Sequence, residues 1–245
     1  IVLTAIEKGF VTLGFSGHSP LAGENWCMQS TEEYRAEIAK LKEKYKARIE
    51  ILCGIEQDYY SQSEEGFDYV IGSVHCVKSG NTLISVDDTA EILKKGINEH
   101  FGADANAFAE EYFRTVGDVV NKTGAQIIGH FDLIQKFCEK TDIFDSTHPR
   151  YINAAKAAVD ALIPTKALFE VNTGAMARGL RTSPYPAKDL LMYICKAGGD
   201  VILNSDCHEK FCLDFGFEES LRLIKECGFR RIAYLTKGQI EFAEI

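Results

Sequence analysis

VILNSDCH, residues 201–208, is a short apolar run that leads directly into a carboxylate and an imidazole two residues apart. In a parallel α/β protein a run of this kind is a buried strand, and its carboxyl end opens into the ligand-binding crevice. Side chains at positions i and i+2 of a strand point to the same side. The side chains of Asp206 and His208 are therefore predicted to approach one point at the end of this strand.

The same arrangement recurs along the chain, because five further strand-like runs end on a histidine, glutamate or asparagine. Together the strand ends carry His18, Glu56, His75, His130, Asn172, Asp206 and His208. Seven strands are predicted, at about residues 11–15, 49–55, 69–74, 126–129, 167–172, 201–206 and 231–235. Helices are predicted at about residues 1–8, 31–47, 87–98, 104–122, 149–162, 187–197 and 217–227. This alternation predicts an α/β protein whose parallel sheet is closed as a barrel. The length of 245 residues predicts a single domain over residues 1–245, because one such barrel takes ~250 residues.

Composition narrows the class of protein. A net charge of −9 argues against a nucleic-acid partner, because nucleic-acid-binding proteins carry a basic surface. No apolar run approaches the ~20 residues that a membrane helix needs, and no signal peptide is visible, so no membrane contact is expected. The eight cysteines include no CxxC pair, and a chain of this length needs no disulfides for stability. We interpret the cysteines as reduced thiols of a cytoplasmic protein.

The strand-end residues predict a metal site. Four of the six histidines belong to this set, and imidazole together with carboxylate suits zinc, iron or manganese. Six potential ligands (His18, Glu56, His75, His130, Asp206 and His208) exceed the three or four that one tetrahedral ion uses, so two or more divalent ions are predicted. A carboxylate such as that of Glu56 can bridge two ions, and ions ~3.5–4 Å apart can stabilise an in-line displacement at phosphorus.

Each residue taken alone also has a purely structural interpretation. A single histidine after a strand can be a hydrogen-bonded residue of the rim, Glu56 can be a salt-bridge partner, and Asp206 can cap a short helix. His100 is interpreted as a surface residue and His148 as part of a helix start. The metal site is favoured over these structural roles only because all of the strand-end residues are predicted to lie at the same end of the sheet.

Two cations are candidates for holding an anionic substrate. The loop 172–186 is basic and contains glycine, and an arginine in it could bind a phosphate group through two hydrogen bonds. Chemistry alone does not choose between Arg178 and Arg181. Lys136, six residues after His130, is a second candidate with a weaker case.

Ordered motifs along nearly the whole chain resemble one known family. They are Gly17-His18-Ser19, Gly54-Ile55-Glu56, Gly72-Ser73-Val74-His75, Gly129-His130-Phe131-Asp132-Leu133, Glu170-Val171-Asn172-Thr173-Gly174 and Ser205-Asp206-Cys207-His208. The set resembles the PHP (polymerase and histidinol phosphatase) superfamily, in its histidinol-phosphatase branch. The resemblance implies a distorted (β/α)7 TIM-like barrel with a trinuclear metal site and hydrolysis of L-histidinol phosphate in histidine biosynthesis.

The resemblance also implies roles for individual residues. Glu56 would bridge two metals and Asp206 would complete the first metal's site. His75 and His130 would serve the second metal, and His18 and His208 the third. Arg178 matches an arginine that binds phosphate, and Lys136 stands where relatives often carry a basic residue.

The chain departs from the family pattern at its start. The family opens with a strand that ends in His-x-His, and no such motif is present here. We therefore expect that about 20 residues, one βα unit, are missing from the sequence in hand.

The function expected from these features is that of a metal-dependent phosphomonoesterase acting on a small anionic phosphate ester. Glu56 and Asp206 are the expected catalytic residues; Asp206 is the nearest candidate for the acid that protonates the leaving group, and a metal-bound water is the alternative. Two other functions stay open: a phosphoesterase acting on nucleotides or other small phosphates, and a non-catalytic scaffold. A homo-oligomer is compatible with the sequence. Trp26 is either part of a lid or a packing residue.

Overall fold

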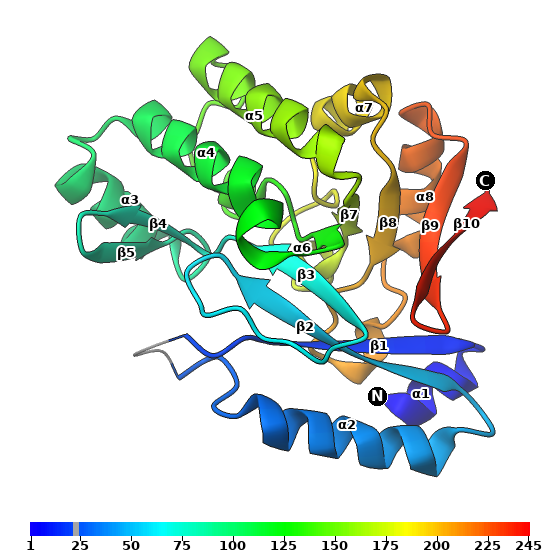
Figure 1. The fold of residues 1–245 in the computed structure, drawn as a ribbon. Helices are drawn as coiled ribbons and strands as arrows, with labels where there is room; N and C mark the ends of the chain where they lie inside the picture. The colour runs from blue at the N-terminus through cyan, green and yellow to red at the C-terminus, as the bar shows by residue number, and fades with distance from the viewer. Residues whose placement is uncertain (22–24) are drawn as a thin grey trace.

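The computed structural model describes residues 1–21 and 25–245, and its centre is a curved sheet of eight strands (Figure 1). The strands lie in the order β1-β2-β3-β6-β7-β8-β9-β10. Their bounds are β1 (Thr12–His18), β2 (Glu50–Asp58), β3 (Tyr69–Ser73), β6 (Ile127–Ile128), β7 (Leu168–Asn172), β8 (Val201–Asn204), β9 (Arg231–Thr236) and β10 (Gln239–Glu244). Neighbouring strands from β1 to β9 are parallel, and β10 is antiparallel to β9. The fold is therefore mixed α/β with a mostly parallel central sheet.

Eight α-helices among the described residues accompany the sheet. They are α1 (Val2–Glu7), α2 (Thr31–Tyr45), α3 (Ala90–His100), α4 (Ala105–Thr123), α5 (Pro149–Leu162), α6 (Gly174–Ala177), α7 (Lys188–Ala197) and α8 (Phe217–Glu226). Local sequence signals set several of their ends. The Ser30 side chain accepts a hydrogen bond from the Glu33 amide at the start of α2, and Gly124 ends α4 in a left-handed conformation with φ 68°.

The strands and helices predicted from the sequence are present, with three additions. A separate antiparallel hairpin, β4 (Cys76–Ser79) and β5 (Thr82–Ser85), follows β3. The strand β10 was not predicted either, and neither was the short helix α6. Cys53, Cys138, Cys195, Cys207, Cys212 and Cys227 are free thiols, as predicted.

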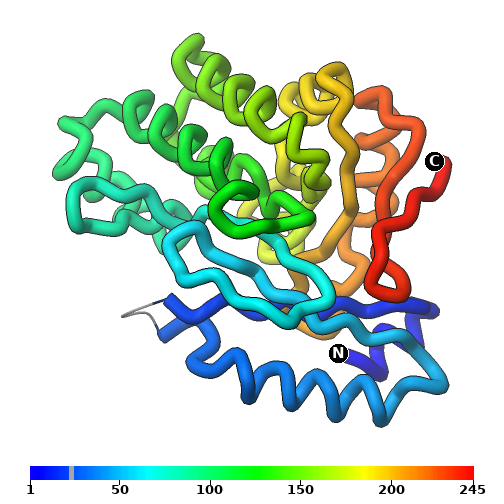
Figure 2. Tube along the Cα trace, viewed as in Figure 1, coloured from blue at the N-terminus to red at the C-terminus, as the bar shows by residue number. Residues whose placement is uncertain are grey.

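The first strand of the sheet, β1, and the β9–β10 hairpin at its other side lie close to each other. Among the described residues, no backbone hydrogen-bond ladder joins them. Figure 2 shows the hairpin of β9 and β10 close to the start of β1. Glu50, the first residue of β2, accepts hydrogen bonds from the Lys237 amide at 2.7 Å and from the Thr236 hydroxyl at 3.2 Å. The sheet is therefore strongly curved, and polar contacts connect its two ends.

Apolar side chains fill both faces of the curved sheet. One cluster packs α4, α5 and α7 against the outer face. A smaller cluster of inward-facing residues comprises Leu52, Tyr69, Ile71, Ile127, Leu168, Ile202 and Ala233. The Tyr69 ring lies so close to Gly14 and Gly54 that neither position has room for a Cβ atom. The glycines of β1 and β2 thus let an aromatic ring occupy the interior.

The parallel register brings the chemically reactive side chains to one edge. His18 at the end of β1 is paired in register with Glu56 of β2, and the ends of β3, β6, β7 and β8 lie along the same edge of the sheet. No helix in the described part of the chain combines the length and the apolar character needed to cross a membrane.

Candidate metal centre

Glu56 is the central residue of the site, because three imidazoles approach its carboxylate. His130 Nε2 lies 3.0 Å and His75 Nε2 3.2 Å from Glu56 Oε1. His18 Nδ1 lies 3.3 Å from Glu56 Oε2. The strands β1 and β2 and the segments that follow β3 and β6 deliver these four side chains, and Glu56, His75 and His130 are buried. The structure thus brings four of the six predicted ligands together.

Asp58 orients His75, and sequence reasoning missed it. Its Oδ2 atom lies 3.1 Å from His75 Nδ1 and accepts the His75 amide at 3.4 Å. Because β2 continues to Asp58, this side chain follows Glu56 at position i+2 and points to the same side. A carboxylate bound to the far nitrogen of an imidazole fixes the tautomer and the orientation of the ring, as it does for metal-ligating histidines.

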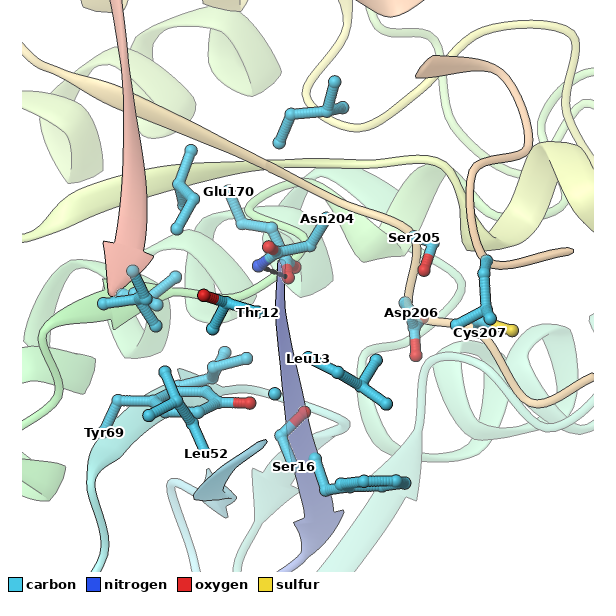
Figure 3. Close-up of a pocket in the computed structure, with 18 of the residues that line it drawn as sticks. Thr12, Leu13, Ser16, Leu52, Tyr69, Glu170, Asn204, Ser205, Asp206 and Cys207 are labelled. Atoms are coloured by element: carbon cyan, nitrogen blue, oxygen red, sulfur yellow. Dashed lines mark hydrogen bonds between the residues drawn. The ribbon is translucent and has the colours of Figure 1, made fainter. Parts of the chain in front are cut away.

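Glu170 anchors the backbone of His130, the second buried histidine, and was also missed. Its Oε2 atom accepts hydrogen bonds from the His130 amide and the Asn172 side chain, both at 2.9 Å. Its Oε1 atom accepts from the Asn204 side chain at 2.8 Å (Figure 3). Burial raises the pKa of Glu170. The i, i+2 relation of Glu170 to Asn172 on β7 was the signal that could have identified this residue.

Asp206 and His208 form a second group with Arg178. Asp206 Oδ1 lies 3.3 Å from His208 Nε2, and Asp206 Oδ2 lies 3.5 Å from Arg178 Nη2. Asp206 does not cap the short helix at Lys210–Cys212, whose N-cap residue is Glu209. A cavity of about 720 Å³ is lined by His18 and Glu56 as well as by Asp206 and His208. The two groups therefore line a shared cavity, and Figure 3 shows its wall at Ser205, Asp206 and Cys207.

The three candidate cationic side chains differ in how accessible they are to a ligand. Arg181 is 8% exposed, donates to the Gln135 carbonyl and lies over the Tyr185 ring. The Arg178 side chain is 33% exposed and lies beside Asp206. Lys136 donates to the Asp87 carbonyl at 2.6 Å. Arg178 is thus the loop arginine that faces the second group of site residues.

The remaining histidines and Trp26 take clear positions. His100 is exposed on α3, and His148 accepts a hydrogen bond from the Arg150 amide as the N-cap residue of α5, as predicted for both. The Trp26 ring packs edge-on against His18 and His75, with centroid distances of 5.1 and 5.7 Å. A lid function of Trp26 stays a prediction.

The electrostatics of the centre are those of a carboxylate surrounded by imidazoles. Burial alone would raise the pKa of Glu56, but His18, His130 and His75 hold this pKa well below its ordinary value. Burial would lower the pKa of His75, yet hydrogen bonds to Asp58 and Glu56 raise it well above its ordinary value. Burial would also lower the pKa of His130, but its hydrogen bond to Glu56 and the negative charge of that carboxylate raise it. Glu56 is therefore ionised at neutral pH, and His75 favours its protonated form when no metal ion is bound.

These residues fit a divalent metal ion. One ligand atom each from His18, Glu56 and His75 lies within 4.8 Å of the others. His130 Nδ1 is buried and has no hydrogen-bond partner among the described residues. Two or three imidazole nitrogens with one carboxylate are a donor set that zinc, iron and manganese accept. An ion would also replace the protons that now stabilise the buried imidazoles.

Proton release on metal binding tests this fit. Because imidazole binds a metal only in its neutral form and the pKa values of His75 and His130 are raised, we expect Zn²⁺ to displace at least one proton and to bind more tightly as pH rises. Calorimetric titration at pH 6.5 in two buffers of different ionisation enthalpy measures the number of protons. Equal apparent enthalpies in both buffers would show that no buried imidazole is a ligand.

Comparisons with known proteins agree with this geometry. A family model described as PHP domain matches residues 1–174. A "Probable histidinol-phosphatase" of Schizosaccharomyces pombe is 26% identical over 262 residues, which cover 97% of this chain and 83% of the relative. A "Histidinol-phosphatase" of Bacillus subtilis is 23% identical over 242 residues, which cover 89% of each chain.

A solved structure shares the fold. The crystal structure of histidinol phosphate phosphatase from Lactococcus lactis, complexed with Zn, L-histidinol and phosphate, is 22% identical with a TM-score of 0.71. The superposition covers 98% of this chain and 90% of the other. The sheet and its helices are therefore arranged as in that protein.

Proposed function

The chain belongs to the PHP domain family, and from this premise we propose that it is a metal-dependent phosphomonoesterase that converts L-histidinol phosphate and water to L-histidinol and phosphate. The observation that carries the proposal is the contact of one buried carboxylate, Glu56, with three imidazoles at the carboxyl edge of a parallel sheet. Curated relatives that match almost the whole chain are named histidinol-phosphatases. A protein with the same fold was crystallised with Zn, L-histidinol and phosphate.

The ligand set of the proposal contains His18, Glu56, His75 and His130, with Asp206 and His208 as further ligands. Six ligands would hold two to three divalent ions, of zinc, iron or manganese. Ions held there would supply Lewis-acid charge to the phosphoryl oxygens and to an attacking water. The curvature of the sheet, seen in the contacts of Glu50 with Thr236 and Lys237, supports a distorted (β/α)7 barrel that forms one domain over residues 1–245.

Protein side chains have three tasks in this proposal. Arg178 donates hydrogen bonds to the phosphate and balances the negative charge that develops on it. Burial would raise the pKa of Asp206, but His208 and Arg178 hold it below its ordinary value, so this carboxylate is ionised. Lying between Arg178 and His208, it positions the water that gives its proton to the leaving alkoxide. Asp58 and Glu170 keep His75 and His130 in place.

A phosphate-release assay tests the proposed function. L-Histidinol phosphate, nucleoside monophosphates and sugar phosphates are compared at equal concentration, and the metal content of the same sample is determined. We expect turnover of L-histidinol phosphate with a clear preference over the other esters. A preference for nucleotides would indicate a different phosphoesterase, and no release by metal-loaded protein would indicate a scaffold.

Arg178→Ala is expected to raise the KM for L-histidinol phosphate by about 10- to 100-fold, the range for a hydrogen bond to a charged group. The control is Arg222→Ala, because Arg222 is exposed on α8, away from the site. Steady-state kinetics of both variants give the comparison. An unchanged KM in Arg178→Ala would remove this arginine from the phosphate site.

A further inference from the structure

A second cavity lies beside the candidate metal centre. It has a volume of about 710 Å³ and lies between the β4–β5 hairpin and α3. His18, His75 and Trp26 belong to its lining. Cavities of ~300–1,000 Å³ are the usual size for small organic ligands. Because His18 and His75 line this cavity and also belong to the centre, a molecule bound in it would lie next to the centre.

The charged residues of this cavity are mainly acidic. Its lining contains Asp87, Asp88 and Glu99 but only one lysine, Lys95. Lys95 Nζ lies 3.9 Å from Glu99 Oε1, so these two charges compensate each other. Asp87 is paired with Lys136, which lies outside the lining, and Asp88 remains as the excess charge. A phosphate group would not be attracted here, whereas a cationic group would.

Asp87 is held in a fixed position close to the centre. The amide of its neighbour Val86 donates to the His75 carbonyl at 2.9 Å. Lys136 Nζ donates to the Asp87 carbonyl at 2.6 Å and lies 3.3 Å from Asp87 Oδ2. The Asp87 side chain is 30% exposed, and a carboxylate has about four lone-pair sites. It can therefore accept a further hydrogen bond from a ligand.

The charge state of Asp87 suits this role. The ion pair with Lys136, at 3.3 Å from Asp87 Oδ2, favours the ionised form of its carboxyl group. The group is therefore ionised at neutral pH.

Trp26, which is 44% exposed, adds an aromatic surface to the same cavity. Such a surface attracts both planar rings and cations.

We propose that this cavity binds the alcohol half of the phosphate ester and that Asp87 recognises its ammonium group, so that the site selects phosphate esters of cationic amino alcohols. The inference rests on the proposed function, because L-histidinol phosphate carries a primary ammonium group and an imidazole beside its phosphate. The phosphate faces Arg178 and the centre, and the cationic half faces Asp87 and Trp26. Asp87 is in this view a specificity-determining residue.

The first test is a ratio of specificity constants. The kcat/KM for L-histidinol phosphate is divided by the kcat/KM for para-nitrophenyl phosphate, whose alcohol half has no cation. Asp87→Asn is expected to lower this ratio by about 10- to 100-fold, as the loss of a charge-assisted hydrogen bond would. Asp142→Asn, at an aspartate whose side chain is 98% exposed, is the control and should leave the ratio unchanged. If Asp87→Asn leaves the ratio unchanged, the proposal is wrong. This includes the case in which kcat/KM falls by the same factor for both esters.

The second test needs neither turnover nor a buried substitution. Trp26 is the only tryptophan of the chain, so its fluorescence reports ligands in this cavity. L-Histidinol should change the fluorescence at lower concentration than 4-(hydroxymethyl)imidazole, which lacks the amine. Asp88→Lys reverses an exposed charge on the cavity wall and should weaken L-histidinol binding by about 5-fold. Equal binding of the two compounds, or no effect of Asp88→Lys, would contradict a role of negative charge in the cavity.

The two proposals fail in different ways. If the wild-type protein releases no phosphate from L-histidinol phosphate, the proposed function is wrong whatever Trp26 reports. If it does release phosphate and the ratio is the same in Asp87→Asn, only the role of this cavity is wrong.

Discussion

Glu56→Gln is expected to lower kcat/KM for L-histidinol phosphate by at least about 10³-fold and to reduce the bound metal per chain. Glutamine keeps the size of the side chain but removes the negative charge that three imidazoles surround. Charge stabilisation by a metal at a phosphoryl group supplies several kcal/mol, and ~4 kcal/mol corresponds to this factor. Steady-state phosphate release and metal analysis of the purified variant measure both effects.

The control for this prediction is Glu65→Gln, at an exposed glutamate nine residues further along the chain. It should retain wild-type turnover and metal content. Thermal unfolding of both variants separates loss of chemistry from loss of fold. Near-wild-type hydrolysis by folded Glu56→Gln protein would refute a central role of this carboxylate.

Asp206→Asn is expected to lower kcat by about 10²- to 10⁴-fold, the usual range for loss of a general acid or base. Asp206 adopts φ 46°, a left-handed conformation that asparagine also tolerates, so the backbone should not change. Asparagine loses the charge that holds the pKa of His208 above its ordinary value and no longer positions, as a carboxylate does, the water that protonates the leaving group.

Asp214→Asn is the matched control for this variant, because Asp214 makes only an exposed ion pair with Lys8 and such pairs contribute little. Kinetics across the pH range give the most informative comparison. A fall in kcat together with loss of the acidic limb of the pH profile would support a role of the ionised Asp206 carboxylate in positioning the water that donates the proton. Wild-type kcat in Asp206→Asn would exclude this residue from catalysis.

Much of the site could be predicted because parallel strands bring their carboxyl ends to one edge. His18, Glu56, His75 and His130 lie far apart in the sequence, yet each lies close to the carboxyl end of a strand of one sheet or just after it. That rule alone brings their side chains together. It also placed Asp206 and His208 near one another, 3.3 Å apart.

The residues that were missed depend on finer details of the strands. The predicted strand at 49–55 stopped short of the true end of β2, so Asp58 was not recognised as an inward-facing residue. Glu170 was not among the predicted site residues, although it shares its side of β7 with Asn172. Both supporting carboxylates obey the same period of two that identified Asp206.

The two hairpins were missed because their turns were overlooked. Gly80-Asn81 connects β4 to β5, and Lys237-Gly238 connects β9 to β10. Gly80, Lys237 and Gly238 have positive φ angles, the conformation that two-residue hairpin turns require. The β4–β5 hairpin matters for function, because it forms one wall of the cavity beside the metal centre. Whether Arg178 or Arg181 faces the site depends on α6 and the loop after it, whose path no local pattern determined.

The most direct test is anomalous X-ray diffraction from crystals of this protein grown with ZnCl₂. We expect anomalous peaks at the carboxyl edge of the sheet, with at least one within about 2.0–2.2 Å of ligand atoms of His18, Glu56 and His75. Peaks confined to surface groups, with the three imidazoles still bound to an ion-free Glu56, would contradict the metal centre and the phosphatase function built on it.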